Sequence, residues 1–296
     1  MYSGIATIDS DADLDALRGT ERFKPARETI AGHAETRIGQ FRDYAKSNAK
    51  IRVLAPPRHD PVAPAILIIA LHGTGGTGDD MARLWRGVAF RRNALLVAPD
   101  ALRPASPNSA GFSWTYRDEA AWYIPWVIDQ VRNTHALSEV ILTGYSQGAN
   151  IAFMLGRTQP DAFRAVIPVS GHYERETPPP ASADGPGWYL LVGERDPWAT
   201  TYGAAVADLR ASGVPVHGAV IPRAGHRLYP SSRVTRELDN ALAWALSPAA
   251  SGTTAAPAAP AQTSPAQPIK ERDKAPRRIP RSIEKPPLAR PTAVVD

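Results

Sequence analysis

The sequence of 296 residues contains no cysteine. This absence excludes disulfide bonds, thiolate metal sites and a cysteine nucleophile, and it agrees with a reducing compartment. Long apolar runs are also lacking, since none approaches the roughly 18 to 20 residues that a membrane-spanning helix needs. The first residues, MYSGIATIDSDADLD, have neither the basic start nor the apolar stretch of a signal peptide. We therefore expect a cytoplasmic protein without a membrane span.

Motifs for metal and nucleotide chemistry are missing as well. The chain has no H-E-x-x-H and no cluster of histidines and carboxylates at ligand spacing, so we expect no catalytic metal. A P-loop requires Gly-Lys followed by Ser or Thr, but Gly78 is followed by Asp79. These absences favour chemistry carried by protein groups alone, with no cofactor.

The positive charge is concentrated at one end of the chain. The formal net charge is +5, which could suggest a nucleic-acid partner. Residues 251–296, however, carry eight Lys or Arg against four acids, so most of the excess lies there. The other 250 residues are close to neutral, and we expect no nucleic acid to bind the globular part.

Composition divides the chain into three regions. Residues 1–50 are polar and helix-like, and we interpret them as a helical N-terminal extension. Residues 51–247 alternate strand-like and helix-like segments, as a globular domain does. Residues 248–296 are mainly Ala, Pro, Ser, Thr and Arg, with too little apolar content to offset ordering entropy, so we expect a disordered tail. Its stretch KERDKAPRRIPR is a candidate for weak contact with an anionic partner. The sequence does not indicate an oligomeric state.

The alternation in residues 51–247 predicts the fold class. Apolar runs such as AILIIAL and EVILTG are continuous, as in strands of a parallel sheet that is covered on both faces. We predict a doubly wound α/β domain, in which a mostly parallel sheet has helices on both faces. The segments between strands are too short for a large lid domain. Helix-like stretches lie near residues 79–92, 118–134, 147–158, 200–212 and 232–246.

The stretch EVILTGYSQGAN carries the most informative motif. An apolar strand runs directly into Gly144-Tyr145-Ser146-Gln147-Gly148, and a helix-like segment follows. This is G-x-S-x-G in the strand–turn–helix context of a nucleophile elbow, which exposes a serine hydroxyl above the sheet. The start of the helix supplies partial positive charge where an oxyanion would form. Ser146 is therefore the candidate nucleophile.

A serine nucleophile needs a base, and the base needs an acid that orients it. Asp196 follows the strand WYLLVG, and His226 follows the strand VHGAVI. Both therefore belong at the carboxyl edge of the sheet, where Ser146 also lies. Glu194 is the rival acid, but Asp196 precedes a proline that favours a turn near the strand end. His172 precedes the acid along the chain, which is the wrong order for the base.

The segment LHGTGGTGDD, residues 71–80, has two interpretations. Its glycines match G-x-G-x-x-G after a strand, and Asp100 stands about where an acid would contact a ribose. A dinucleotide-binding oxidoreductase is therefore one hypothesis, although two aspartates at the following helix start would repel a pyrophosphate. The His-Gly pair at the head of the segment is instead typical of esterase oxyanion loops.

LHGTGG, GYSQG, GERDPW and AGH, in that order, resemble the α/β-hydrolase superfamily. Over residues 51–247 the chain is similar to the phospholipase/carboxylesterase group and to polyhydroxybutyrate-depolymerase-like esterases. The resemblance implies a serine esterase that acts on a small-molecule ester. It implies the following roles: Ser146 as nucleophile, His226 as base, Asp196 as orienting acid, and the backbone N–H groups of Thr74 and Gln147 as the oxyanion hole.

Two alternatives stay open at this point. GYSQG is also similar to the elbow of cutinases and mycolyl-arabinogalactan esterases, which would make the substrate a lipid ester. A non-catalytic binding protein with the same fold is the other alternative. Aromatic residues near the predicted site are candidates for substrate binding: Trp114, Tyr145 and Trp198, with Tyr116 and Trp122 as further candidates.

Overall fold

The computed structural model describes residues 8–9, 12–57, 59–173, 185–227 and 231–250. Seven strands in these residues form one sheet, in the order β1-β3-β2-β4-β5-β6-β7. The pair β1 and β3 is antiparallel, and every other neighbouring pair is parallel. The strands are β1 Val53–Leu54, β2 Ala65–Leu71, β3 Leu95–Val97, β4 Leu137–Tyr145, β5 Ala165–Val169, β6 Gly187–Gly193 and β7 Val216–Ile221.

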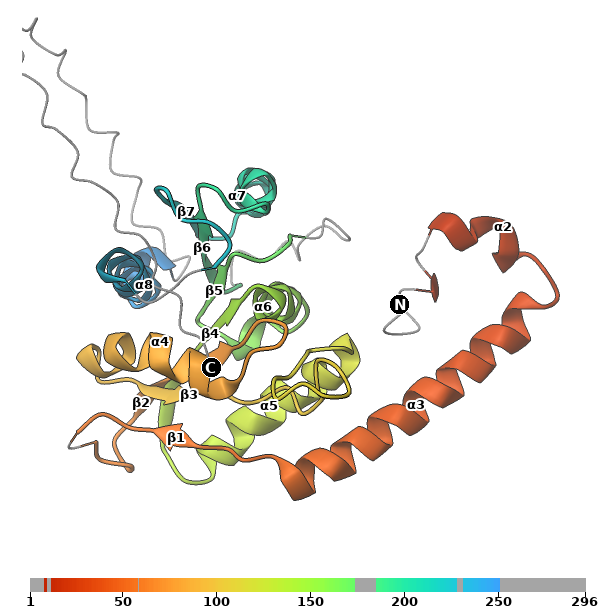
Figure 1. The fold of residues 1–296 in the computed structure, drawn as a ribbon, viewed down its shortest axis with the longest axis horizontal. Helices are drawn as coiled ribbons and strands as arrows, with labels where there is room; N and C mark the ends of the chain where they lie inside the picture. Colours follow the sequence, from red (N-terminus) through yellow and green to blue (C-terminus); the bar gives the residue numbers. More distant parts are fainter. Residues whose placement is uncertain (1–7, 10–11, 58, 174–184, 228–230, 251–296) are drawn as a thin grey trace, which may run out of the picture. The chain divides into compact units, whose positions relative to one another are not determined.

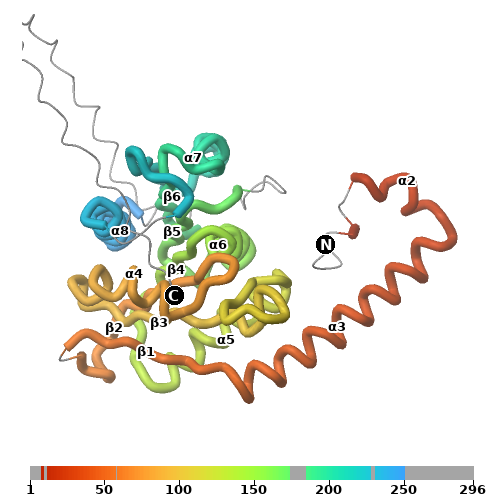
Figure 2. The backbone as a smooth tube through the Cα atoms, in the orientation of Figure 1, coloured from red at the N-terminus to blue at the C-terminus, as the bar shows by residue number. Residues whose placement is uncertain are grey.

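Helices cover both faces of the sheet, as Figure 1 shows. Side chains of α5, α6 and α7 belong to one buried cluster, and those of α4 and α8 belong to a second cluster on the opposite face. Figure 2 follows the backbone through β4, β5 and β6, with α6 on one side and α8 on the other. The described connections contain no inserted lid domain. The helices are α4 Gly78–Arg91, α5 Arg117–Arg132, α6 Gln147–Thr158, α7 Ala199–Ala211 and α8 Ser232–Ala245.

The strand β2 shows why the apolar runs are continuous. Leu67 and Ile69 belong to the cluster beneath α5 and α6, whereas Ile68 belongs to the cluster beneath α4 and α8. All three side chains are fully buried. Because successive side chains of a strand point to opposite faces, both faces must be apolar when both are covered. Burial of each such side chain stabilises the folded state by about 1.5 to 3 kcal/mol.

The N-terminal region is helical, with α2 at Asp15–Arg18 and α3 at Phe23–Asn48. The last part of α3 packs on the domain, because Phe41 is buried in the cluster that includes α5. Arg37 donates hydrogen bonds to Asp118 at 2.5 Å and to the buried Glu119 at 2.9 Å. Burial lowers the pKa of Arg37, but its bonds to the two carboxylates outweigh this and raise it. A buried carboxylate bonded in this way ties α3 to α5.

The described structure continues beyond residue 247, where the sequence predicted that the tail begins. Pro248–Ala250 form a 3-10 helix, and Ala250 is fully buried. A Cβ atom on Gly187 would lie 2.5 Å from the Ala250 carbonyl oxygen, so the segment packs directly on β6. The predicted boundary is therefore about three residues too early. The rest of the predicted tail, 251–296, lies outside the described residues.

Candidate active site

Ser146 occupies a strained turn between β4 and α6. Its backbone has φ 53° and ψ −118°, a conformation that costs a non-glycine residue on the order of 1 to 3 kcal/mol. Its N–H donates to the Val169 carbonyl of the neighbouring strand at 2.9 Å, which holds the turn in place. The neighbouring β-sheet thus maintains a turn that points the hydroxyl of Ser146 away from the strand.

The two glycines of the elbow are required by close backbone contacts. A Cβ atom on Gly148 would lie 2.4 Å from the Leu71 carbonyl oxygen, which belongs to β2. A Cβ atom on Gly144 would lie 2.1 Å from the Gly148 carbonyl oxygen. Real Cβ contacts of this kind do not occur, so only glycine lets α6 start this close to the sheet. The G-x-S-x-G spacing therefore has a steric cause in this protein.

The structure brings together the three side chains that the sequence singled out. Ser146 Oγ lies 2.9 Å from His226 Nε2. His226 Nδ1 lies 3.1 Å from Asp196 Oδ2 and 3.3 Å from Oδ1. The Asp196 side chain is fully buried, whereas that of His226 is 35% exposed. A hydroxyl, an imidazole and a buried carboxylate thus form one hydrogen-bonded series that opens to solvent at the imidazole.

Backbone contacts between two loops place the acid and the base. Asp196 Oδ1 accepts the Trp198 N–H at 2.9 Å, so one carboxylate oxygen is bound by its own loop. The Arg195 N–H donates to the Ala224 carbonyl at 2.8 Å, which joins this loop to the one that carries His226. The rival acid Glu194 is exposed, and it accepts the Arg223 N–H at 2.6 Å. Glu194 therefore stabilises the turn after β7, and Asp196 is the acid beside the imidazole.

Tyr145, a predicted substrate contact, supports the His226 loop. Its hydroxyl donates to the His226 carbonyl at 2.5 Å, and the two ring centroids are 5.5 Å apart. The side chain is half-buried. The strand residue next to Ser146 is thus bonded to the loop that holds the base, and this contact fixes the distance between the elbow and the loop.

His72 is a fully enclosed residue whose role the sequence did not reveal. Its Nε2 accepts the Ala101 N–H at 3.1 Å, and its Nδ1 lies 2.8 Å from the Gly73 carbonyl oxygen. Because a backbone N–H can only donate, Nε2 is unprotonated and Nδ1 carries the hydrogen. His72 is 1% exposed, and burial lowers its pKa below the ordinary value. The neutral ring therefore holds the Gly73 carbonyl in one orientation.

This burial predicts a pH dependence of stability. The folded chain resists protonation of His72, whereas the unfolded chain accepts a proton near the ordinary value of 6.5. The stability contributed by neutral His72 is therefore complete above this pH and declines as the pH falls below it. In urea titrations, we expect the wild-type free energy of unfolding to fall more steeply with acidification than that of His72→Gln. Parallel pH curves for the two proteins would contradict this expectation.

The predicted oxyanion loop, which contains Gly73 and Thr74, lies directly against Ser146. The Gly76 N–H donates to the Gly73 carbonyl at 3.0 Å, and Gly75 has φ 75°, which is the pattern of a type II turn. A Cβ atom on Gly73 would lie 3.1 Å from Ser146 Cβ, so the loop touches the nucleophile. Thr74 is the next residue and is exposed. Its N–H, like that of Gln147, donates to no other described residue.

The Gln147 side chain fastens a second loop to the elbow, a role that the sequence analysis missed. Its Oε1 accepts the Trp114 N–H at 2.9 Å and the Ser113 hydroxyl at 3.1 Å. The same loop pairs with the oxyanion loop, because the Gly75 N–H donates to the Phe112 carbonyl at 2.8 Å. The Gln147 side chain thus links the start of α6 to the segment that pairs with the predicted oxyanion loop. No local pattern predicts this contact, since residues 33 or 34 positions away form it.

Three further aromatic candidates make contacts within the protein. Trp114 is 5% exposed, and its indole N–H donates to the His72 carbonyl at 2.9 Å, so it supports the loop from the core. Tyr116 lies beneath the Arg37 guanidinium, 3.9 Å from the ring centroid. Trp122 stacks on Trp126 with centroids 5.5 Å apart. Trp114 therefore offers little free surface, and its contact with substrate stays a prediction.

Trp198 lies beside the predicted site at the start of α7. Its backbone N–H donates to Asp196 Oδ1, and its ring centroid is 4.7 Å from that of His172. The backbone N–H of His172 donates to Asn150 Oδ1 at 2.8 Å. Trp198 is half-buried, so part of its ring faces solvent at this edge of the sheet. Substrate contact by Trp198 stays a prediction.

Side chains of the protein accept hydrogen bonds from the backbone N–H groups at the start of α4, where a phosphate would otherwise bind. Asp100 Oδ1 accepts the Gly78 N–H at 2.7 Å. Thr77 and Asp80 form a capping box, in which each side chain accepts the other residue's N–H. Bonds to Asp80 also lower its pKa despite partial burial, so it is anionic at neutral pH. Carboxylates at this helix start exclude the dinucleotide interpretation, because a pyrophosphate needs the same N–H groups.

Metal-binding side chains do not gather anywhere in the described residues. No group of three or more His, Asp or Glu in this part of the chain could hold a metal ion. In the same residues, no helix is both long enough and apolar enough to cross a membrane.

Comparisons with known proteins identify the fold. No family model matches the sequence, and no curated protein matches it. Solved structures do match. Esterase PE8 is 21% identical with a TM-score of 0.52, over 67% of this chain and 100% of that one. A carboxylesterase from Mesorhizobium loti is 21% identical with a TM-score of 0.51, over 65% and 93%. Arabidopsis thaliana SOBER1 is 20% identical with a TM-score of 0.52, over 62% and 100%.

The chain has the α/β-hydrolase fold. Its seven-stranded, mostly parallel sheet with helices on both faces agrees with that fold. The shared part leaves about a third of this chain unmatched while spanning nearly all of the other chains. Because identities near 20% show the fold alone, the chemistry has to be argued from the side chains of this protein.

Proposed function

We propose that this protein is a serine hydrolase that cleaves carboxylic esters through an acyl-serine intermediate. The observation that carries the proposal is the series Ser146 Oγ to His226 Nε2 at 2.9 Å and His226 Nδ1 to Asp196 Oδ2 at 3.1 Å. These distances suit proton transfer from the hydroxyl to the imidazole. The similar solved structures include esterases and a carboxylesterase, which supports the same reaction class.

In the first step, Ser146 Oγ attacks the ester carbonyl carbon while its proton moves to His226 Nε2. The carbonyl π bond breaks, and its electron pair forms the oxyanion of a tetrahedral intermediate. The N–H groups of Thr74 and Gln147, which have no acceptor among the described residues, would stabilise this oxyanion. Each such donor contributes on the order of 3 kcal/mol to the transition state in related enzymes.

In the second half of the reaction, the tetrahedral intermediate collapses and the alkoxide leaves. His226 returns its proton to the leaving oxygen, so a free alcohol departs and an acyl ester of Ser146 stays. Water then attacks the acyl carbon while His226 takes its proton. Collapse of the second intermediate releases the carboxylic acid and restores the serine hydroxyl. The Asp196 carboxylate stabilises the imidazolium that forms in each half.

A fluorophosphonate probe tests the nucleophile without knowledge of the substrate. We expect the probe to modify Ser146 covalently at neutral pH, because the phosphonyl group mimics an acyl group and fluoride leaves. Intact-mass measurement and peptide mapping locate the adduct. Heat-unfolded protein is the control, since an unfolded serine has no base beside it. A native protein that resists labelling at Ser146 would instead favour a non-catalytic binding protein with the same fold.

A further inference from the structure

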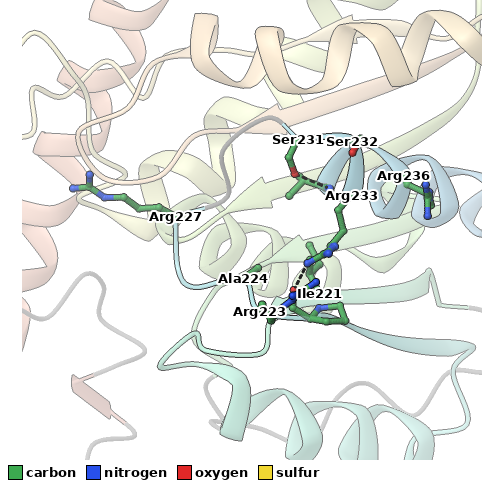
Figure 3. Close-up of a pocket in the computed structure, with 10 residues that line it drawn as sticks. Ile221, Arg223, Ala224, Arg227, Ser231, Ser232, Arg233 and Arg236 are labelled. Carbon is green, nitrogen blue, oxygen red and sulfur yellow. Dashed lines mark hydrogen bonds between the residues drawn. The ribbon is translucent and has the colours of Figure 1, made fainter. Parts of the chain in front are cut away.

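A groove rich in arginine lies between the end of β7 and the start of α8 (Figure 3). Its volume is about 540 Å³. Among the described residues that line it are four arginines and no acid. We call it the arginine groove. Its lining arginines are Arg223, Arg227, Arg233 and Arg236.

Three of these arginines give the groove a net positive charge. Arg233 extends from the first turn of α8 toward Ile221 and Arg223, and it donates to the Pro222 carbonyl at 2.7 Å. Arg236 lies about one turn further along the same helix. Among the described residues, no carboxylate pairs with the guanidinium groups of Arg223, Arg233 and Arg236. Arg227 points away from the other three, and the inference does not use it.

Cations that line one groove without a paired carboxylate repel one another, and an anion in the groove would relieve this repulsion. Glu194, which follows β6, accepts the backbone N–H of Arg223 and not its guanidinium. α8 is a 14-residue helix that begins in the groove, so its dipole adds to the positive potential. The groove therefore has the electrostatics of a site for a small anion.

The groove adjoins the base of the proposed reaction. Ala224 lines the groove, and His226 follows it two residues later on the same loop. His226 Nε2 gives its proton to the leaving oxygen, so the alcohol part of an ester departs on the side of His226. We infer that the groove binds an anionic group, a carboxylate or a phosphate, carried by the alcohol part of the substrate. This inference rests on the proposed function.

A matched pair of esters tests the inference. One is 3-carboxyphenyl butanoate, and the other is 3-carbamoylphenyl butanoate, which has nearly the same shape and no charge. We expect the wild-type kcat/KM to be at least about tenfold higher for 3-carboxyphenyl butanoate than for the carbamoyl ester, because its carboxylate forms a charged hydrogen bond with arginine. Monophenyl succinate, with its carboxylate on the acyl side, should show no such advantage over phenyl butanoate. If the carboxylate of monophenyl succinate raised kcat/KM as much as the carboxylate of the phenyl ring does, the assignment of the groove to the alcohol part would be overturned.

The variant Arg223→Asn with Arg236→Ala removes two charges from the groove. Asparagine tolerates the φ of 61° at position 223, and alanine favours the helix at position 236. We expect the carboxylate-to-carbamoyl ratio of kcat/KM to fall to near one. Arg210→Ala is the control, because Arg210 is an exposed arginine at the end of α7, outside the groove. A ratio that is unchanged in the double variant would overturn the inference.

Calorimetry with the alcohol products separates this inference from the proposed function. We expect 3-hydroxybenzoate to bind the wild type at least about tenfold more tightly than 3-hydroxybenzamide, and the double variant to lose this difference. Equal binding of the two phenols would overturn the inference, whatever the ester kinetics show. Binding of inorganic phosphate without any preference between the phenols would show a site for free anions and would also overturn it. Failure to hydrolyse either ester, by contrast, would refute the proposed function.

Discussion

Ser146→Ala is expected to lower kcat for p-nitrophenyl butanoate by about 10⁶-fold, the loss found when a serine hydrolase loses its nucleophile. The change removes the one hydroxyl that lies 2.9 Å from His226 Nε2 and leaves the base and the oxyanion loop in place. The fold should persist, since the Ser146 backbone bond to Val169 does not involve the side chain. Steady-state kinetics and a thermal unfolding curve measure the two quantities.

Ser170→Ala is the matched control for this experiment. Ser170 also has φ 53° after a strand of the same sheet, and it is fully buried. Its hydroxyl has no hydrogen-bond partner among the described residues. Removing the hydroxyl should therefore leave kcat within a few-fold of the wild-type value. If Ser146→Ala kept wild-type activity, or if both variants lost activity equally, Ser146 would not be the nucleophile.

Asp196→Asn is expected to lower kcat by about 10⁴-fold with little change in KM. Asp196 Oδ1 is already bound by the Trp198 N–H at 2.9 Å, so the amide oxygen of asparagine should take that position. The NH₂ group then faces His226 Nδ1, where Oδ2 stood at 3.1 Å. His226 must accept that hydrogen bond and carry its own hydrogen on Nε2. In this tautomer it cannot take the proton of Ser146.

Glu194→Gln is the control for the acid. Glu194 accepts the Arg223 N–H, and a glutamine oxygen can accept the same bond, so the turn after β7 is kept. We expect kcat within a few-fold of the wild-type value. A large loss in Glu194→Gln with a small loss in Asp196→Asn would reverse the assignment of the acid.

Local patterns were sufficient for the strands, the helices and the three side chains of the proposed reaction. Strands of a parallel sheet covered on both faces need continuous apolar runs, and β2, with Leu67, Ile68 and Ile69, shows that run in the sequence. Asp196 and His226 each follow such a strand. Since parallel strands end at one edge of the sheet, their order along the chain predicted that they would meet Ser146.

Local sequence patterns did not predict the contacts that support the site. His72 appeared only as the head of a glycine-rich loop, yet it orients the Gly73 carbonyl and accepts the Ala101 N–H. Trp114 was predicted to bind substrate, but its burial became visible only once α5 and the oxyanion loop had packed around it. The tail boundary failed for the same reason, because Ala250 is buried by contact with the distant Gly187.

The glycines of residues 71–80 show which features the sequence determined and which required the tertiary structure. Their spacing matched two motifs equally well, because a tight turn before a helix requires glycine whether it holds a phosphate or approaches a serine. The sequence by itself determined the sheet, the elbow and the order of nucleophile, acid and base, since these depend on periodicity and on chain order. Only the tertiary structure placed Asp100 on the Gly78 N–H and Gly73 against Ser146. Contacts between residues far apart in the chain place this loop beside Ser146, and no local pattern records such contacts.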